Sequence, residues 1–340
     1  MKIVTCASYF ATGSSAVTDL ISEYDGVKSL TKYEFRFLHD PDGVSELEYN
    51  LVENFNRHNS GHALKRYRKL VEYYSDHLLV RRYEPFFGNH WKELSYRYID
   101  ALTDFSYAGY WQYDFYDRGP WFEFWHKLPG RILSRTLWKV FPATRFATYH
   151  DVTLASHPTE EKFLECTRAY TDALMQAANP ENKPFVMMDQ ILPSSNIKRH
   201  MRYLNNTQAV IVDRDPRDVF LLEKYEYNEA PCPKNVEDFC KWFRYCRETK
   251  NQECYDDRKV LILQFEDLIY HYEETKQKLI AWVGLKESDH REPFKYLDPR
   301  KSIKNTRYWV SHPQYRQEAD RIAELLPEFL YDYSEIEGLE

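Results

Sequence analysis

Short apolar runs recur near both ends of the chain and predict buried β-strands. Residues 2–7 (KIVTCA), 207–215 (TQAVIVDRD) and 259–268 (KVLILQFEDL) are rich in aliphatic side chains, and 185–189 (FVMMD) is a fourth candidate. Continuous apolar runs of this length are typical of strands that are covered on both faces. Helical stretches separate them, so we expect an α/β fold with a central parallel sheet flanked by helices.

The pattern changes between about residues 43 and 180. Aromatic and charged side chains dominate there and few clean strands appear, as in 107–132 (YAGYWQYDFYDRGPWFEFWHKLPGRI). The stretch contains no repeat and no low-complexity tract. We therefore predict a single domain over residues 1–340, in which 43–180 is a large, mostly helical and aromatic-rich insertion.

Composition and charge narrow the classes of protein. The chain has 340 residues, of which 43% are hydrophobic and 29% charged, as in ordinary globular proteins. A net charge of −7 gives no general attraction to nucleic acid or to anionic membranes, so basic groups should matter locally. Neither a signal peptide nor a bilayer-spanning apolar run is recognisable. The cysteines are spaced too widely for a zinc site, and we expect free thiols, no metal and a cytoplasmic location.

A glycine turn follows the first predicted strand. Gly13, Ser14 and Ser15, within CASYFATGSSAV, lead into a predicted helix. A nucleoside-triphosphate loop needs G-x-x-x-x-G-K-[ST], but Ser8 occupies the first glycine position and Ser14 the lysine position. The backbone N–H groups at the start of the helix would still bind an anion. A plain serine-capped helix is the alternative interpretation.

Two arginines follow the strand that ends in VIVDRD. Arg214 stands at the carboxyl end of this strand, where open α/β sheets bind ligands, and Arg217 begins the next helix. A guanidinium group there suits a phosphate monoester. The alternative is an ion-pair network with the neighbouring aspartates Asp213, Asp215 and Asp218.

A basic cluster lies near the C-terminus, just after Pro299. It contains Arg300, Lys301, Lys304 and Arg307. A solvated charged loop would explain the cluster, but in an acidic chain it is also a candidate anion site.

Together these stretches resemble the sulfotransferases that use 3′-phosphoadenosine 5′-phosphosulfate (PAPS). ATGSS (11–15) is similar to the loop of that family that binds the 5′-phosphosulfate, and RDPRD (214–218) to its 3′-phosphate motif. QFEDL (264–268) and PRKSIKN (299–305) are similar to its later strand-to-helix stretch and basic loop. The motifs follow the order of the family over roughly the first 40 and the last 150 residues.

The resemblance implies a P-loop-like fold, PAPS as co-substrate and transfer of a sulfuryl group to an acceptor hydroxyl, without a metal. Residues 1–42 would carry the phosphosulfate loop and the second strand, 43–180 the acceptor side, and 181–340 the 3′-phosphate half with the basic loop. By position in the motifs, the expected donor-binding residues are Thr12, Gly13, Ser14, Ser15, Ala16, Arg214, Arg300, Lys301 and Ser302.

Two positions depart from the pattern of the family. Ala11 stands where the loop usually has Lys or Arg, and Leu222 stands where a serine usually contacts the 3′-phosphate. The first departure means either that another cation stabilises the leaving phosphate or that transfer is impaired. The second departure means that the C-terminal loop must supply more of the contacts to the 3′-phosphate.

The expected general base is a carboxylate. KYEFRF (32–37) is similar to the stretch that carries the catalytic glutamate in glycan-type members of the family, which implies Glu34 as the base. Lys32 and Arg36 would lie on the same strand face by the period of two. His150 is the alternative, because small-molecule members use a histidine. A carboxylate base and the aromatic insertion favour a carbohydrate acceptor, since rings stack on sugar faces.

Two other functions stay open. A kinase with a degenerate phosphate loop is disfavoured, because the loop lysine is missing and no clear metal-binding aspartate follows a strand. A catalytically silent relative that binds a nucleotide or a glycan is kept open by Ala11 and Leu222.

Overall fold

The computed structural model describes residues 1–77, 80–229, 231–248, 253–334 and 336. The chain folds into two compact units. The sheet unit consists of Met1–His39 with Ala178–Glu340, and the insertion unit of Asp40–Ala177. The insertion unit corresponds to the segment 43–180 whose composition differs from the rest. That the two units act as one domain stays a prediction.

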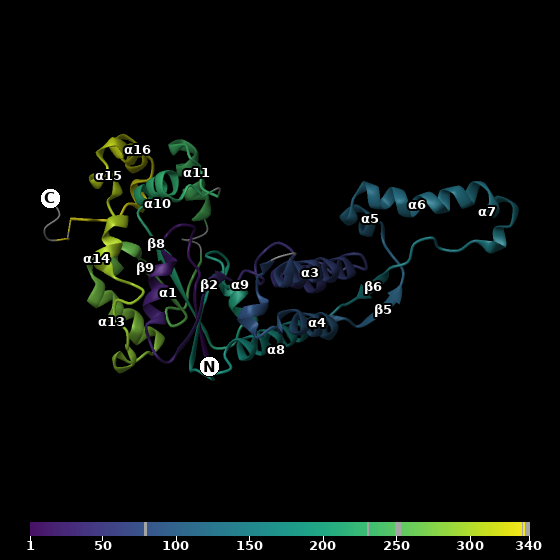
Figure 1. Ribbon diagram of the computed structural model, residues 1–340, viewed down its shortest axis with the longest axis horizontal. Helices are drawn as coiled ribbons and strands as arrows, with labels where there is room; N and C mark the ends of the chain where they lie inside the picture. The colour runs from purple at the N-terminus through teal and green to yellow at the C-terminus, as the bar shows by residue number, and fades with distance from the viewer. Residues whose placement is uncertain (78–79, 230, 249–252, 335, 337–340) are drawn as a thin grey trace. The chain divides into compact units, whose positions relative to one another are not determined.

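The sheet unit is built on five parallel strands in the order β2-β7-β1-β8-β9. Figure 1 labels β2, β8 and β9 of this sheet. All four predicted runs form strands, and the predicted parallel sheet is confirmed. The fifth strand, β2, lies in the segment that follows the first helix. The strands are β1 (Lys2–Cys6), β2 (Val27–Glu34), β7 (Phe185–Asp189), β8 (Thr207–Asp213) and β9 (Val260–Gln264).

Three helices pack on the sheet through one apolar cluster. These are α1 (Ser14–Ser22), α12 (Phe265–Tyr270) and α13 (Tyr272–Val283), which contribute fully buried residues such as Val17 and Leu279. The strands β1, β7, β8 and β9 contribute apolar side chains to the same cluster. Each fully buried aliphatic side chain stabilises the fold by about 1.5–3 kcal/mol.

A second cluster joins helices α10 (Pro216–Leu222), α11 (Val236–Cys246) and α16 (Arg316–Leu325), which lie together in Figure 1. Phe220 and Phe239 form part of its interior, with ring centroids 5.0 Å apart. The remaining short helices of the sheet unit are α9 (Ile197–His200), α14 (Pro299–Ser302) and α15 (Tyr308–Ser311).

The register of the parallel strands brings three loops to one edge of the sheet. Cys6 at the end of β1 pairs with Asp189 of β7 and with Val210 of β8. Because parallel strands end at a common edge, the glycine turn after β1, Asp189 and the segment that begins at Arg214 all lie at this edge.

The insertion unit is mostly helical, as predicted, and also contains two short antiparallel strand pairs. Its core is aromatic: the rings of Tyr98 and Tyr170 stack at 4.6 Å, and Tyr67 and Trp91 are fully buried beside them. Within the described residues, no helix is both long and apolar enough to cross a membrane. The elements are α2 (Val44–Glu48), α3 (Asn59–Ser75), β3 (Asp76–His77), β4 (Val80–Arg81), α4 (Trp91–Leu102), β5 (Phe105–Ala108), α5 (Gln112–Arg118), α6 (Pro120–Arg135), α7 (Leu137–Val140), β6 (Val152–Ala155) and α8 (Glu160–Ala178).

Candidate functional site

The glycine turn is shaped by its backbone and by its contact with α12. Gly13 is the N-cap of α1 with φ of +85°, and a Cβ atom at this position would lie 2.5 Å from the ring of Phe265. Ala11 also has a positive φ, of 60°. Because the N-cap residue is a glycine, no capping side chain among the described residues accepts from the first N–H groups of α1. These N–H groups and the helix dipole favour an anion at the turn.

The predicted residues around Gly13 differ in what they offer to a ligand. The Thr12 hydroxyl is buried, 2.7 Å from the Val212 carbonyl, and so ties the loop to β8. The N–H of Ala16 donates to the Gly13 carbonyl at 3.0 Å. Ser14 is half-buried and Ser15 is exposed. The two serine hydroxyls and the N–H groups before Ala16 are therefore the donors suited to an anion.

Arg214 lies beside this turn. It is 6% exposed, and its guanidinium donates to the carbonyls of Ala11, at 3.4 Å, and of Asn305. It also lies 4.4 Å above the ring of Phe265. Its Nε is buried and has no hydrogen-bond partner among the described residues. Since buried donors are normally satisfied, this N–H is suited to a ligand.

Arg217 belongs to an ion-pair network with a neighbouring aspartate, which was the alternative interpretation of this segment. Its Nε and Nη2 donate to Asp215 at 2.9 and 2.6 Å, and its guanidinium lies 4.0 Å from the ring centroid of Trp309. Asp213 forms a buried ion pair with Arg247 at 2.7 Å. The ion-pair network therefore includes Arg217, whereas the side chain of Arg214 contacts carbonyl oxygens.

Two buried carboxyl groups lie near Arg214. Asp218 accepts from the N–H groups of Arg307 and Tyr308 at 2.9 and 2.8 Å, and burial raises its pKa against the opposing effect of Arg214. Glu266 accepts from the Asp215 N–H at 3.0 Å, and burial raises its pKa to about 8, again opposed by Arg214. A carboxyl that is neutral at pH 7 leaves the Arg214 charge less compensated, which favours an anionic ligand.

The C-terminal basic loop reaches the same place through its backbone. Asn305 contacts Arg214, as described above, but Arg300 and Lys301 pair with Asp298 at 2.9 and 3.6 Å and are 79% and 80% exposed. The N–H of Ser302 also donates to the Asp298 carbonyl, at 3.0 Å. Both cationic side chains are exposed to solvent although Asp298 is only 9% exposed, so both cations can also contact a phosphate that approaches from the solvent side.

The structure shows what surrounds Leu222 and Ala11, the two positions that depart from the pattern of the family. Leu222 ends α10 and is 2% exposed within the second apolar cluster, so this position serves packing. Ala11 supplies no cation, but the Arg214 guanidinium contacts its carbonyl. Among the predicted donor-binding residues, Arg214 therefore brings the positive charge that lies nearest to the glycine turn.

Glu34 lies at the end of β2 and pairs in register with Asp189 of β7. Its side chain is 56% exposed and 3.5 Å from Nη1 of Arg36. Because β7 separates β2 from β1, and neighbouring strands lie about 4.8 Å apart, Glu34 is about 10 Å from the first strand. Lys32 is exposed. That Glu34 reaches an acceptor hydroxyl stays a prediction.

Asp189 is the site residue that sequence reasoning missed. It lies between Glu34 and Cys6 in the register of the sheet, and its Oδ1 is buried without a hydrogen-bond partner among the described residues. Burial raises its pKa to about 7, and the charge of Glu34 adds to this shift. The signal was present: an acidic residue ends a predicted buried strand, at the edge where α/β sheets bind ligands.

His150 is exposed and belongs to the insertion unit, whereas Glu34 belongs to the sheet unit. The two candidate bases therefore come from different units. The cysteines are free, and the described residues contain no cluster of three or more His, Cys, Asp or Glu side chains suited to a metal ion.

Comparisons with known proteins give a weak structural similarity. No protein-family model matches the chain, and no curated protein matches its sequence. Two solved structures align with 96% of the chain: sulfotransferase STF1 from Mycobacterium tuberculosis H37Rv, at 10% identity and over 76% of that chain, and sulfotransferase STF9 from Mycobacterium avium, at 9% identity and over 75%. Both have a TM-score of 0.35, so the functional argument rests on the residues of the site.

Proposed function

We propose that the protein transfers a sulfuryl group from PAPS to an acceptor hydroxyl on a carbohydrate. The observation that carries the proposal is the buried Arg214, whose Nε has no partner in the described residues, beside a glycine turn without the lysine of nucleoside-triphosphate loops. This combination fits a nucleotide with two separate phosphate groups better than a triphosphate.

The donor is held at both of its phosphates. The N–H groups of Gly13 and Ser14, with the Ser14 and Ser15 hydroxyls, bind the 5′-phosphosulfate at the start of α1. Arg214 binds the 3′-phosphate, and Arg300, Lys301 and Ser302 approach from the basic loop when the pairs with Asp298 open. Thr12 and Ala16 shape the turn.

Transfer proceeds in line. The acceptor oxygen bonds to sulfur while the bond between sulfur and the phosphate oxygen breaks, and adenosine 3′,5′-bisphosphate leaves. Glu34 accepts the proton of the acceptor hydroxyl, and donors at the turn stabilise the charge that develops on the leaving phosphate. Asp189 is the neighbouring carboxyl, and its pKa of about 7 makes it the competing candidate for the base.

The acceptor side lies in the insertion unit. Tyr107, Tyr110 and Tyr116 are 42%, 45% and 84% exposed there, and phenol rings both stack on sugar faces and donate hydrogen bonds. A cytoplasmic location accords with the free cysteines.

Nucleotide binding tests the proposal. Adenosine 3′,5′-bisphosphate should raise the melting temperature, because a ligand at 100 times its Kd stabilises the native state by about 2.7 kcal/mol. ATP with magnesium should not raise it. Equal stabilisation by ATP would favour the degenerate kinase.

Turnover separates the enzyme from a silent relative. The protein is incubated with PAPS and a panel of glycans, and the products are analysed by mass spectrometry for added sulfate. Binding of the bisphosphate with no sulfated product on any acceptor would favour a silent relative, for which Ala11 supplies a reason.

A further inference from the structure

Helix α6 of the insertion unit presents a row of large apolar side chains to solvent. None of its residues is buried. Trp121, Trp125 and Ile132 are 76%, 63% and 53% exposed, and their spacing of four and seven residues places them on one face of the helix. The row continues after the helix with Val140 and Phe141, which are 67% and 57% exposed. Single exposed apolar residues are ordinary, but a continuous row marks an interaction surface.

A neighbouring face of α6 packs against the rest of the insertion unit. Phe122 and His126 pack on Tyr149, with ring centroids 5.7 and 5.1 Å away, and the Arg118 guanidinium lies 4.8 Å from the Phe122 ring. Phe122 and His126 are four residues apart, so they share a face that lies about 100° around the helix from the face of the tryptophans. Packing on this side therefore fixes which face remains exposed.

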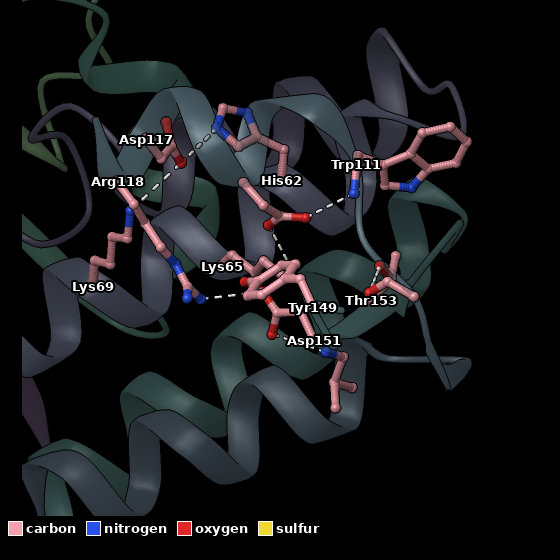
Figure 2. A network of polar contacts seen from close by, with 12 residues as sticks. His62, Lys65, Lys69, Trp111, Asp117, Arg118, Tyr149, Asp151 and Thr153 are labelled. Atoms are coloured by element: carbon pink, nitrogen blue, oxygen red, sulfur yellow. Dashed lines mark hydrogen bonds and ion pairs between the residues drawn. The ribbon is translucent and has the colours of Figure 1, made fainter. Parts of the chain in front are cut away.

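A polar network supports Tyr149 and Arg118 (Figure 2). Tyr149 donates to Asp151 at 3.0 Å, and Arg118 contacts the same carboxylate at 3.1 Å. Lys65 of α3 bonds Asp114 at 2.6 Å and Asp151 at 3.3 Å. Asp114 and Asp151, the acidic groups beside the start of α6, are thus already paired with cations.

The exposed segment itself is basic. Residues 120–146 contain five basic side chains and one acidic side chain, in a chain whose net charge is −7. The one acidic residue, Glu123, pairs with Lys127 at 2.5 Å. The other basic residues form no ion pair within the described residues, and all four are exposed: Arg131, Arg135, Lys139 and Arg145.

We propose that residues 120–146 dock on an anionic lipid bilayer. Trp121, Trp125 and Ile132 would enter the boundary between headgroups and acyl chains, and the unpaired arginines and Lys139 would contact lipid phosphates. Tryptophan with aliphatic residues on one face and arginine and lysine beside them is the composition of interfacial helices. A surface that binds carbohydrate would use aromatic rings and would not need the aliphatic side chains of Ile132 and Val140. Since α6 has 16 residues, it is about 24 Å long and lies in the plane of the interface.

Vesicle binding by the full chain tests the proposal. The protein is sedimented with vesicles of phosphatidylcholine alone and with vesicles that also contain phosphatidylglycerol, at low and at high salt. We expect binding to the anionic vesicles, at least about tenfold weaker binding to the neutral ones, and a loss of binding as salt screens the charges. Equal binding to both, or to neither, overturns the proposal.

Two variants locate the surface. The triple change Arg131→Glu, Arg135→Glu and Lys139→Glu should weaken binding to anionic vesicles by about 100-fold or more. Trp121→Ala with Trp125→Ala should weaken it by about tenfold or more, because two rings no longer enter the interface. Circular dichroism and melting temperature confirm that both variants fold.

Matched controls use exposed residues of the sheet unit. The triple change Lys241→Glu, Lys286→Glu and Arg316→Glu alters the net charge equally, and Tyr245→Ala removes a ring that is 73% exposed. Both controls should keep vesicle binding within about threefold. A control triple that weakens binding as much as the α6 triple shows that net charge decides, and overturns the proposal. Self-association that requires Trp121, without vesicle binding, assigns the surface to a second copy of the chain and also overturns it.

Discussion

In the sheet unit, charged side chains lie inside: Arg214 is 6% exposed, and Asp218 and Glu266 are fully buried. In helix α6 of the insertion unit, the large apolar side chains lie outside, with Trp121 and Trp125 both more than 60% exposed. Both arrangements reverse the usual preference of these residue types.

The two reversals differ in what they do to stability. Burying a charge costs several kcal/mol unless hydrogen bonds and partners compensate, so the carboxyls around Arg214 oppose folding unless they are neutral. An exposed tryptophan contributes little to folding in either direction. The buried charges therefore indicate a ligand site, and the exposed rings indicate a docking surface that folding does not need.

The largest expected effect is on turnover in the sheet unit. Glu34→Gln keeps the shape of the side chain and removes the proton acceptor, so turnover should fall by about 10²- to 10⁴-fold while the bisphosphate still binds. The measurement is the rate of sulfated product, with Asp189→Asn assayed in parallel. If Asp189→Asn removes turnover and Glu34→Gln does not, Asp189 is the base.

His150→Ala is the matched control for this prediction. It should keep most of the activity, because the proposed base, Glu34, belongs to the sheet unit. Loss of turnover in His150→Ala with normal turnover in Glu34→Gln would move the chemistry to the insertion unit, and a small phenol or alcohol would then be the better acceptor class.

The next effect concerns stability within the insertion unit. Phe115 is 1% exposed and packs on Tyr149 at 5.1 Å, so Phe115→Ala should lower the free energy of unfolding by about 3–5 kcal/mol. Trp121→Ala should change it by less than about 0.5 kcal/mol, because the ring is 76% exposed. Urea unfolding measures both. A large loss in Trp121→Ala would mean that the exposed face of α6 is needed for folding.

The third effect is a pH dependence at the edge of the sheet. The pKa of Asp189 is raised from 3.8 to about 7, so the native state favours the neutral carboxyl. Its stabilising contribution is present below about pH 4 and is lost as pH rises toward 7. Asp189→Asn removes this loss and should be more stable than the wild type above about pH 7, by about 2–4 kcal/mol, and not at about pH 4.

Unfolding in urea across this pH range measures the difference, and Glu34→Gln is the informative control. The charge of Glu34 helps to raise the pKa of Asp189, so its removal should lower that pKa and shrink the loss of stability. An unchanged loss in Glu34→Gln would mean that the two carboxyls do not interact. A difference between Asp189→Asn and the wild type that does not vary with pH contradicts the assignment.

The smallest expected effect separates the two arginines. Arg214→Ala should weaken adenosine 3′,5′-bisphosphate by at least about 1.5 kcal/mol, the low end for a charge-assisted hydrogen bond, and should affect adenosine 5′-phosphate less. Arg217→Ala should change this affinity less than Arg214→Ala, because Arg217 already pairs with Asp215. Calorimetric titration measures both. Equal losses for the two nucleotides would mean that Arg214 does not bind the 3′-phosphate.

The sequence alone determined the strands of the sheet unit and their order along the chain. The apolar runs that predict β1, β7, β8 and β9 all form strands, and the turn at Gly13 begins a helix where its serines predict one. Strand periodicity, glycine turns and helix starts depend on residues close together in the chain, so these features could be predicted locally.

Only the tertiary structure decided which partners two similar arginines contact. Arg214 and Arg217 are three positions apart, and both have aspartate neighbours. Yet one contacts the carbonyl oxygens of Ala11 and Asn305 and the other pairs with Asp215 under Trp309. Those carbonyls and that ring come from segments distant in the sequence, and no local pattern specifies them.

The same holds for Asp189 and α6. The chain shows an aspartate at the end of a strand, but the register of three strands places it between Glu34 and Cys6. Burial there, with the charge of Glu34, raises its pKa. The chain also shows many rings between residues 107 and 132, but packing on Tyr149 decides that Phe122 is turned inward and Trp121 outward. Burial depends on contacts between distant segments, and burial sets both the charge of a carboxyl and the exposure of a ring.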